Sequence, residues 1–92
     1  MQEQQIQFEV CVDNEMGLHA RPAAKLAREA AKFQSSIRLE LEGSSADAKS
    51  VLDILGLAAQ QGRRVTVSAT GPDARDAVDH LKQFFYHKET EE

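Results

Sequence analysis

Apolar and polar residues alternate in three separate segments of the chain, at residues 5–12, 36–42 and 64–70. Successive side chains of a β-strand point to opposite faces, so this alternation predicts three strands that each have one apolar and one polar face. A short fourth strand is predicted at residues 45–48, after the turn at Gly43.

Three other segments have the 3.6-residue period of a helix with one apolar side. The first is predicted over residues 20–32. The second begins at Ser50, a residue type favoured at the N-cap, and continues toward Gly56. Gly71-Pro72-Asp73 opens the third, and its apolar stripe is formed by Ala74, Ala77, Val78, Leu81, Phe84 and Phe85.

Strands that are polar on one side favour an open sheet whose other side is covered by helices. The order β-α-β-β-α-β-α contains no repeat and no linker. We therefore predict an α+β open-faced sandwich, with a four-stranded, mainly antiparallel sheet and three helices packed on one face. It is expected to form a single domain over residues 1–92 with an ordered core at about residues 5–88.

The composition predicts a globular protein, since 41% of the 92 residues are hydrophobic and 28% are charged. The chain has no apolar run of about 18 residues, and its first five residues lack the basic and apolar regions of a signal peptide. We expect a cytoplasmic protein without membrane insertion. The net charge of -4 argues against nucleic-acid binding, which relies on a basic surface.

His19 lies where the first strand pattern has ended and the first helix pattern begins, within Gly17-Leu18-His19-Ala20-Arg21-Pro22. The first N–H groups of a helix have no intrahelical partner, and the helix dipole is positive there, so this end favours an anion such as phosphate. A neutral imidazole is a nucleophile, and the Arg21 guanidinium matches phosphate oxygens. These features predict that His19 is phosphorylated, with the N–H groups of Ala20 and Arg21 binding the phosphate.

Other chemistry finds little support in the sequence. His80 and His87 lie toward the polar side of the last predicted helix, where solvent exposure is the simpler interpretation, and no set with metal-ligand spacing surrounds them. Cys11 falls on the polar face of its strand and is interpreted as a surface thiol. Phosphate-binding loops, dinucleotide fingerprints and Gly-x-Ser-x-Gly elbows are missing. We expect no metal and no cofactor.

Several surface features allow two interpretations. Basic residues recur along the outward face of the first helix, either as an ordinary solvated face or as a docking surface for an acidic partner: Arg21, Lys25, Arg28 and Lys32. Leu52 and Leu55 are either core residues or an exposed docking patch. Ser50 is an N-cap by default, although a phosphate there would meet free N–H groups and a favourable dipole without unfolding the domain.

The segment from Gly17 to Ala23 resembles the active-site signature of HPr, the histidine phosphocarrier family of the bacterial phosphotransferase system. The resemblance extends over residues 5–86. Ala48-Lys49-Ser50-Val51, followed by Gly62, is similar to the regulatory serine segment of that family, and residues 65–85 are similar to its C-terminal part.

This resemblance implies that His19 accepts a phosphoryl group on Nδ1 from phosphorylated enzyme I, which is charged by phosphoenolpyruvate, and passes it to a histidine of an enzyme IIA. Arg21 stabilises the phosphate. Ser50 is the implied target of an ATP-dependent HPr kinase/phosphorylase. We expect a monomer that docks its partners through a set of surface residues: Met16, Ala24, Lys25, Arg28, Leu52 and Leu55.

Two branches of the family and two other classes of function stay open at this point. Met16 and Thr70-Gly71-Pro72 look more like the nitrogen-related branch, whereas Ala48-Lys49-Ser50 and Leu55-Gly56-Leu57 favour the sugar-transport branch. The domain could instead be a binding module regulated through Ser50. A small-ligand-binding domain of similar shape would require a closed apolar pocket.

Overall fold

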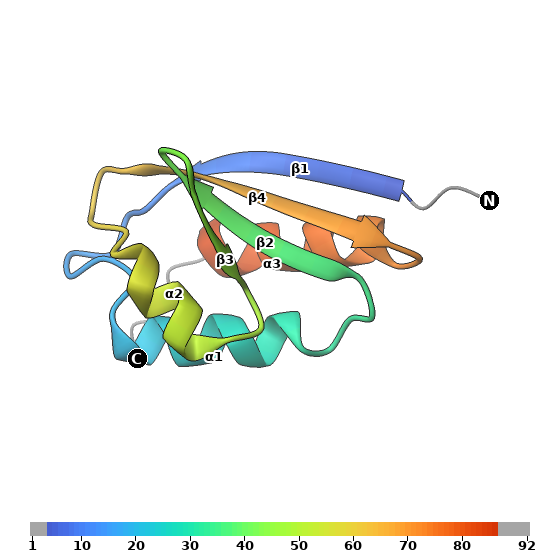
Figure 1. The fold of residues 1–92 in the computed structure, drawn as a ribbon, viewed down its shortest axis with the longest axis horizontal. Coiled ribbons are helices and arrows are strands. Elements are labelled where there is room, and N and C mark those ends of the chain that lie inside the picture. Colours follow the sequence, from blue (N-terminus) through green and yellow to red (C-terminus); the bar gives the residue numbers. More distant parts are fainter. Residues whose placement is uncertain (1–3, 87–92) are drawn as a thin grey trace.

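The computed structural model describes residues 4–86, which form one four-stranded sheet covered by three helices (Figure 1). The strands are β1 (Gln4–Cys11), β2 (Ser36–Leu41), β3 (Ser44–Asp47) and β4 (Arg64–Gly71). Their spatial order is β1-β4-β2-β3, and every neighbouring pair is antiparallel. The strands β1 and β3 are therefore the two edges.

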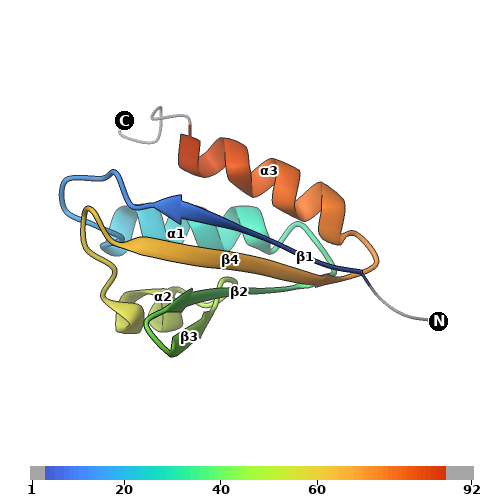
Figure 2. The ribbon, with the colours of Figure 1, turned by 90° about the horizontal axis from the view of Figure 1, so that it is seen from above.

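The helices are α1 (Ala20–Ala30), α2 (Val51–Leu57) and α3 (Ala74–Tyr86). Figures 1 and 2 show α1 and α3 side by side beneath the sheet, with the short α2 beside β3. The predicted open-faced sandwich is confirmed. None of these helices within residues 4–86 is long and apolar enough to cross a membrane.

The strand register explains why one face of the sheet is apolar. Cross-strand partners place apolar residues in rows that run across β1, β4 and β2, and the two central rows are Ile6–Ala69–Ile37 and Phe8–Val67–Leu39. Because the side-chain period of a strand is two, the intervening residues form polar rows on the other face. Leu26 of α1, Ile54 of α2 and Leu81 of α3 are fully buried against the apolar face.

Aromatic side chains fasten α3 to the edge strand β1. The rings of Phe8 and Phe85 meet edge to face with centroids 6.4 Å apart, and Phe84 contacts Phe85 at 5.2 Å. The Lys82 ammonium lies 5.7 Å from the centroid of the Phe8 ring. These contacts shield the apolar side of a strand that has only one neighbour in the sheet.

Element boundaries differ from the predicted ones by a few residues. The first helix ends at Ala30 rather than Lys32, because the N–H groups of Lys32 and Phe33 bond to the carbonyls three residues earlier and tighten the last turn. Val12 leaves the first strand but stays buried, and its N–H donates to the carbonyl of Arg63. His87 and the end of the predicted ordered core at residue 88 lie outside the described residues.

His80 is partly exposed, and it also makes contacts that the sequence did not predict. Its Nε2 lies 2.5 Å from Oε1 of Glu29, and its ring packs at 5.4 Å on Phe33. Hydrogen bonds from Lys32 and then His80 lower the pKa of Glu29 below its ordinary value. His80 therefore joins α3 to α1, although its side chain stays 41% exposed.

Asp73 ties the start of α3 to the turn that leads into β2. Its carboxylate accepts hydrogen bonds from the N–H groups of Gln34 and Ser35, each at 2.9 Å, and from the Ser35 hydroxyl at 2.5 Å. The Ser35 hydroxyl bond, followed by the Gln34 N–H bond, lowers the pKa of Asp73. Gly71 permits this close approach, because a Cβ there would lie 2.8 Å from Cα of Ser35.

Candidate functional site

His19 is the N-cap of α1 and leaves its imidazole unused by the helix. Its backbone is extended, with φ -84° and ψ -166°, and its side chain makes no capping hydrogen bond. The carbonyl of His19 accepts the N–H of Ala23 at 2.9 Å, which begins the helix. The half-buried ring therefore stands at the positive end of α1 without a local capping role.

The first turn of α1 leaves two N–H groups beside the ring. Pro22 has no N–H, and the N–H of Ala23 is bound to His19, so the donors without an intrahelical acceptor are those of Ala20 and Arg21. No acidic residue lies in this turn. Arg21, two residues after His19, is exposed, and a guanidinium is a strong donor to anions.

A loop formed by residues 12–18 leads from β1 to His19 and rests against the segment that follows α2. The N–H of Leu18 donates to the carbonyl of Ala59 at 2.9 Å. Gly17 has φ +73°, and a Cβ on it would lie 2.4 Å from that carbonyl oxygen. The approach to His19 thus depends on contacts distant in sequence.

The basic residues on α1 and just after it do not form a uniform row of free cations. Arg21 and Arg28 are exposed, but Lys32 pairs with Glu29 at 2.8 Å. Lys25 is half-buried. Positive charge is therefore most available at the two arginines, of which Arg21 adjoins His19.

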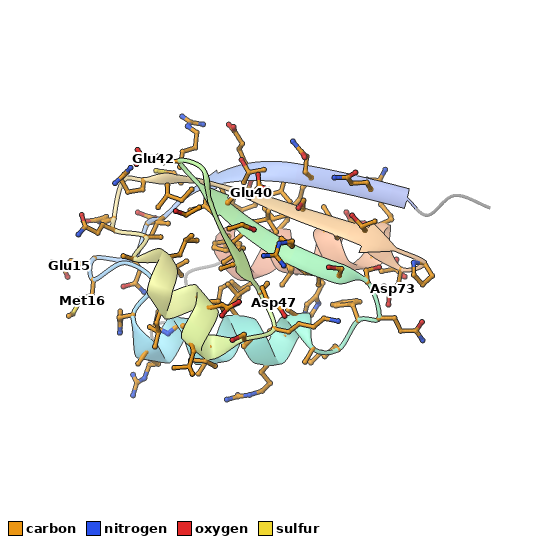
Figure 3. The ribbon with its side chains drawn as sticks, in the orientation of Figure 1. Glu15, Met16, Glu40, Glu42, Asp47 and Asp73 are labelled. Atoms are coloured by element: carbon orange, nitrogen blue, oxygen red, sulfur yellow. The ribbon has the colours of Figure 1, made fainter. Side chains whose placement is uncertain are left out.

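Three of the predicted docking residues are large apolar side chains that the structure leaves exposed. Met16 is 73%, Leu52 81% and Leu55 37% exposed. Figure 3 shows Met16 and Glu15 at the tip of the loop before α1, at the opposite end of the molecule from Asp73. Of the two interpretations of Leu52 and Leu55, the structure favours exposed surface residues over core residues. Ala24 is half-buried.

Ser50 caps α2 as predicted. Its hydroxyl accepts the N–H of Asp53 at 3.2 Å. The carboxylate of Asp53 turns back to accept the N–H of Asp47, and the carboxylate of Asp47 accepts the N–H of Lys49. The Lys49 ammonium donates to the carbonyl of Phe33 at 2.7 Å. The charged groups beside the start of α2 are therefore the carboxylates of Asp47 and Asp53, while the Lys49 ammonium is engaged elsewhere.

The remaining candidates add no second site. Cys11 is exposed, as its strand position predicted. Within residues 4–86, no three His, Cys, Asp or Glu side chains are grouped to hold a metal ion. A groove of about 420 Å³ between β3 and α2 is open to solvent rather than closed, and it is lined by Ser44, Ser45, Leu52, Asp53, Gly56 and Leu57.

Comparison with known proteins decides the family. The family described as the PTS HPr component phosphorylation site matches residues 6–87. The chain belongs to the HPr family. It is 44% identical over 75 residues to the phosphocarrier protein HPr of Vibrio cholerae, covering 82% of this chain and 86% of that one.

Solved structures of HPr proteins share the fold. HPr-C-His from Thermoanaerobacter tengcongensis superposes with a TM-score of 0.89 at 37% identity, over 95% of this chain and 98% of that one. A structure described as an HPr dimer from the same organism has a TM-score of 0.68 at 39% identity, over 80% and 85% of the two chains. Membership of this family implies phosphoryl transfer within the phosphotransferase system.

Sequence patterns did not reveal Ala59 as part of the site. The pairing of Leu18 with Ala59 joins two loops distant in the chain, and no periodicity reports such a contact. Gly17 was the one available signal, because a glycine beside a candidate nucleophile often marks a close backbone approach.

Proposed function

We propose that this HPr family member carries a phosphoryl group on His19, taking it from phosphorylated enzyme I and delivering it to a histidine of an enzyme IIA. The observation that carries the proposal is the placement of an uncapped imidazole at the start of α1, beside the N–H groups of Ala20 and Arg21. Such donors stabilise the negative charge of a bound phosphoryl group most strongly when they are already in place.

Transfer to His19 requires the lone pair of Nδ1, so the attacking imidazole is neutral and protonated on Nε2. A bond forms between Nδ1 and phosphorus while the bond from phosphorus to the donor histidine breaks. Arg21 and the two N–H groups then hold the phosphoryl oxygens. In delivery, a bond forms between phosphorus and the enzyme IIA histidine while the bond between phosphorus and Nδ1 of His19 breaks. No metal or cofactor takes part in this proposal.

The docking surface that accompanies this chemistry comprises the exposed apolar residues and the positive face of α1. Its proposed members are Met16, Ala24, Lys25, Arg28, Leu52 and Leu55. Apolar residues supply the buried centre of a protein interface, and the arginine charge accelerates encounter with an acidic partner.

The decisive experiment is labelling with phosphoenolpyruvate and enzyme I, followed by mapping of acid-labile phosphate. We expect one phosphate on His19 and none in His19→Ala, which should keep the far-ultraviolet circular dichroism spectrum of the wild type. A His80→Gln/His87→Gln double variant retains His19 alone and should still be labelled. Acid-labile phosphate on His19→Ala would contradict the assignment.

The donor distinguishes the two branches of the family. We propose the sugar-transport branch, supported by relatives that carry the name phosphocarrier protein HPr. The rate of labelling by a sugar-branch enzyme I should exceed the rate with a nitrogen-branch enzyme I. The opposite order would assign the chain to the nitrogen branch.

Ser50 is a second proposed phosphorylation site, regulatory rather than catalytic, supported by the place of its half-buried hydroxyl at the N-cap of α2. Incubation with ATP and an HPr kinase/phosphorylase should place acid-stable phosphate on Ser50. Ser50→Ala should remove the label, whereas Ser44→Ala should not. Acid-stable phosphate that persists in Ser50→Ala would exclude this site.

We further propose that the carrier acts in the cytoplasm as a monomer. A related HPr is described as a dimer, so oligomeric state needs its own measurement. Light scattering coupled to size exclusion should give a mass near 10.2 kDa over the concentration range of the labelling assay. A mass near twice that value would contradict the monomer.

A further inference from the structure

We infer that the carbonyl group of Ala59 is a positioning group for phosphoryl transfer, acting through the backbone of Leu18 on His19. This inference rests on the proposed function of His19 and adds to it a support that lies outside the signature segment. The contact joins the end of the α2 segment to the loop that presents the imidazole, and the three figures agree that these segments meet at one end of the molecule.

The hydrogen bond that makes this contact is shielded from water. The N–H of Leu18 donates to the carbonyl oxygen of Ala59 at 2.9 Å. Leu18 is 6% exposed and Ala59 is 3% exposed. Losing such a bond leaves a buried polar group without a partner, so the position of Leu18 is strongly fixed.

Gly17 is the residue that lets the two segments approach. Its φ of +73° favours glycine, and a Cβ would lie 2.4 Å from the oxygen of Ala59 and 3.0 Å from Cα of Gln60. Both of those atoms belong to the main chain, so a side chain at Gly17 cannot be accommodated by a rotamer change. The loop must shift by a large fraction of an ångström or more.

The position of Ala59 is itself determined by the end of α2. Ala58 is the C-cap in the left-handed conformation, with φ 55° and ψ 42°, and its N–H donates to the carbonyl of Leu55 at 3.1 Å. Two further bonds fasten the same loops together, from Gly62 N–H to Val12 at 2.8 Å and from Val12 N–H to Arg63 at 2.9 Å. The segment after α2 is thus a fixed support for the segment before α1.

A displaced Leu18 changes the site because His19 is its neighbour and also the N-cap. The same backbone carries the imidazole and sets where the N–H groups of Ala20 and Arg21 lie. Misplacing reacting groups by about 1 Å can reduce a rate by about two powers of ten without removing any chemical group. The effect should therefore fall on the rate of transfer more than on partner binding.

The test compares two glycine substitutions that share a positive φ. Gly17 and Gly43 have φ of +73° and +87°, but a Cβ at Gly43 meets no atom within 4 Å. Phosphorylation by enzyme I should be about 10- to 100-fold slower for Gly17→Ala at saturating enzyme I, with a nearly unchanged KM. Gly43→Ala should stay within about twofold of the wild type, because it carries the strain without the clash and lies in the turn between β2 and β3.

A second pair of variants tests Ala59 without a clash. Ala59→Gly frees the backbone at the support, and Ala48→Gly makes the same change at another buried alanine outside a helix or strand. We expect Ala59→Gly to slow transfer several-fold and Ala48→Gly to leave its rate unchanged. This pair decides the question should Gly17→Ala not fold.

The NMR chemical shifts of the His19 ring separate a displaced site from a general loss of stability, which would leave these shifts unchanged. Gly17→Ala and Ala59→Gly should shift the ring resonances of His19 while those of His80 stay in place. Wild-type rates and His19 shifts in folded Gly17→Ala, or equal losses in Ala59→Gly and Ala48→Gly, would overturn the inference. A wild-type protein that takes no phosphate would instead overturn the proposed function.

Discussion

At the scale of single residues, the proposed site combines one nucleophilic ring with a separate group that would bind the phosphate. His19 supplies a ring that makes no cap, and Arg21 supplies an exposed guanidinium two residues later. A guanidinium offers a planar fork of donors, whereas an ammonium offers a compact charge. The identity of the cation at residue 21 therefore matters more than its charge alone.

Replacing Arg21 tests this distinction. Arg21→Ala should slow phosphorylation of His19 by about 10- to 100-fold, since a hydrogen bond to a charged group contributes about 1.5–3 kcal/mol. Arg21→Lys should recover only part of the rate. The measurement is the initial rate of acid-labile labelling, with Arg28→Ala as the control for general loss of positive charge from α1. Equal effects of Arg21→Ala and Arg28→Ala would indicate that Arg21 acts only through long-range electrostatics.

At the scale of elements, the two helices nearest the site end differently. Both C-caps are alanines, but Ala31 of α1 is right-handed with φ -68°, whereas Ala58 of α2 is left-handed with φ 55°. The left-handed region is unfavourable for a residue with a Cβ. The end of α2 therefore holds strain that the end of α1 does not.

Glycine substitutions should have opposite effects at these two caps. Ala58→Gly relieves the left-handed strain and should raise the free energy of unfolding by about 0.5–1 kcal/mol. Ala31→Gly relieves nothing and should lower it by about 0.5–1 kcal/mol, because glycine increases the entropy of the unfolded chain. Urea denaturation measures both values. A loss of stability in Ala58→Gly would show that the turn after α2 does not strain Ala58.

Local patterns predicted the elements but not how they meet. The alternation of Ile37 and Leu39 with polar neighbours found β2, because burial of one sheet face imposes that period. The contact of His80 with Glu29 escaped the helical pattern, since a residue toward the polar side of one helix can still face a second helix. The bond from Leu18 to Ala59 escaped for the related reason that it depends on how α2 is placed against α1.

At the scale of the whole molecule, the proposed docking residue Met16 and the hydrogen bonds that join the start of α3 to the turn before β2 lie at opposite ends. One end carries the loop before α1, with the exposed Met16 at its tip (Figure 3). The other end is closed by Asp73, whose carboxylate joins the start of α3 to Ser35 at the entrance to β2. Stability should therefore depend on groups that lie far from the proposed phosphorylation site.

Acid should weaken the far end through Asp73. The pKa of Asp73 in the folded protein is below its ordinary value of 3.8. Its contribution to stability is therefore complete above pH 3.8 and is lost as the pH falls through the folded pKa. Asp73→Asn should be less stable than the wild type at pH 7, and the gap should narrow in this acid range.

Urea midpoints at pH 7, 4 and 2.5 measure this gap. Asp76→Asn is the matched control, because Asp76 lies in the first turn of the same helix but is exposed. A gap between the wild type and Asp73→Asn that stays constant down to pH 2.5 would show that the charged form is not what stabilises the turn. Labelling of His19 at pH 7 should be retained by Asp73→Asn wherever it is folded.

Pro22 bears on how long a phosphoryl group would remain on His19. A helix that opens with ordinary residues offers one more main-chain donor than α1 does, because the third residue of α1 is a proline. A carrier that stabilises its phosphorylated form too strongly would release the phosphoryl group slowly, which would limit transfer as much as slow uptake would. Because Pro22 has no N–H, the proposed phosphorylated form would be held by one donor fewer, and we expect onward transfer of the phosphoryl group to be faster for this reason.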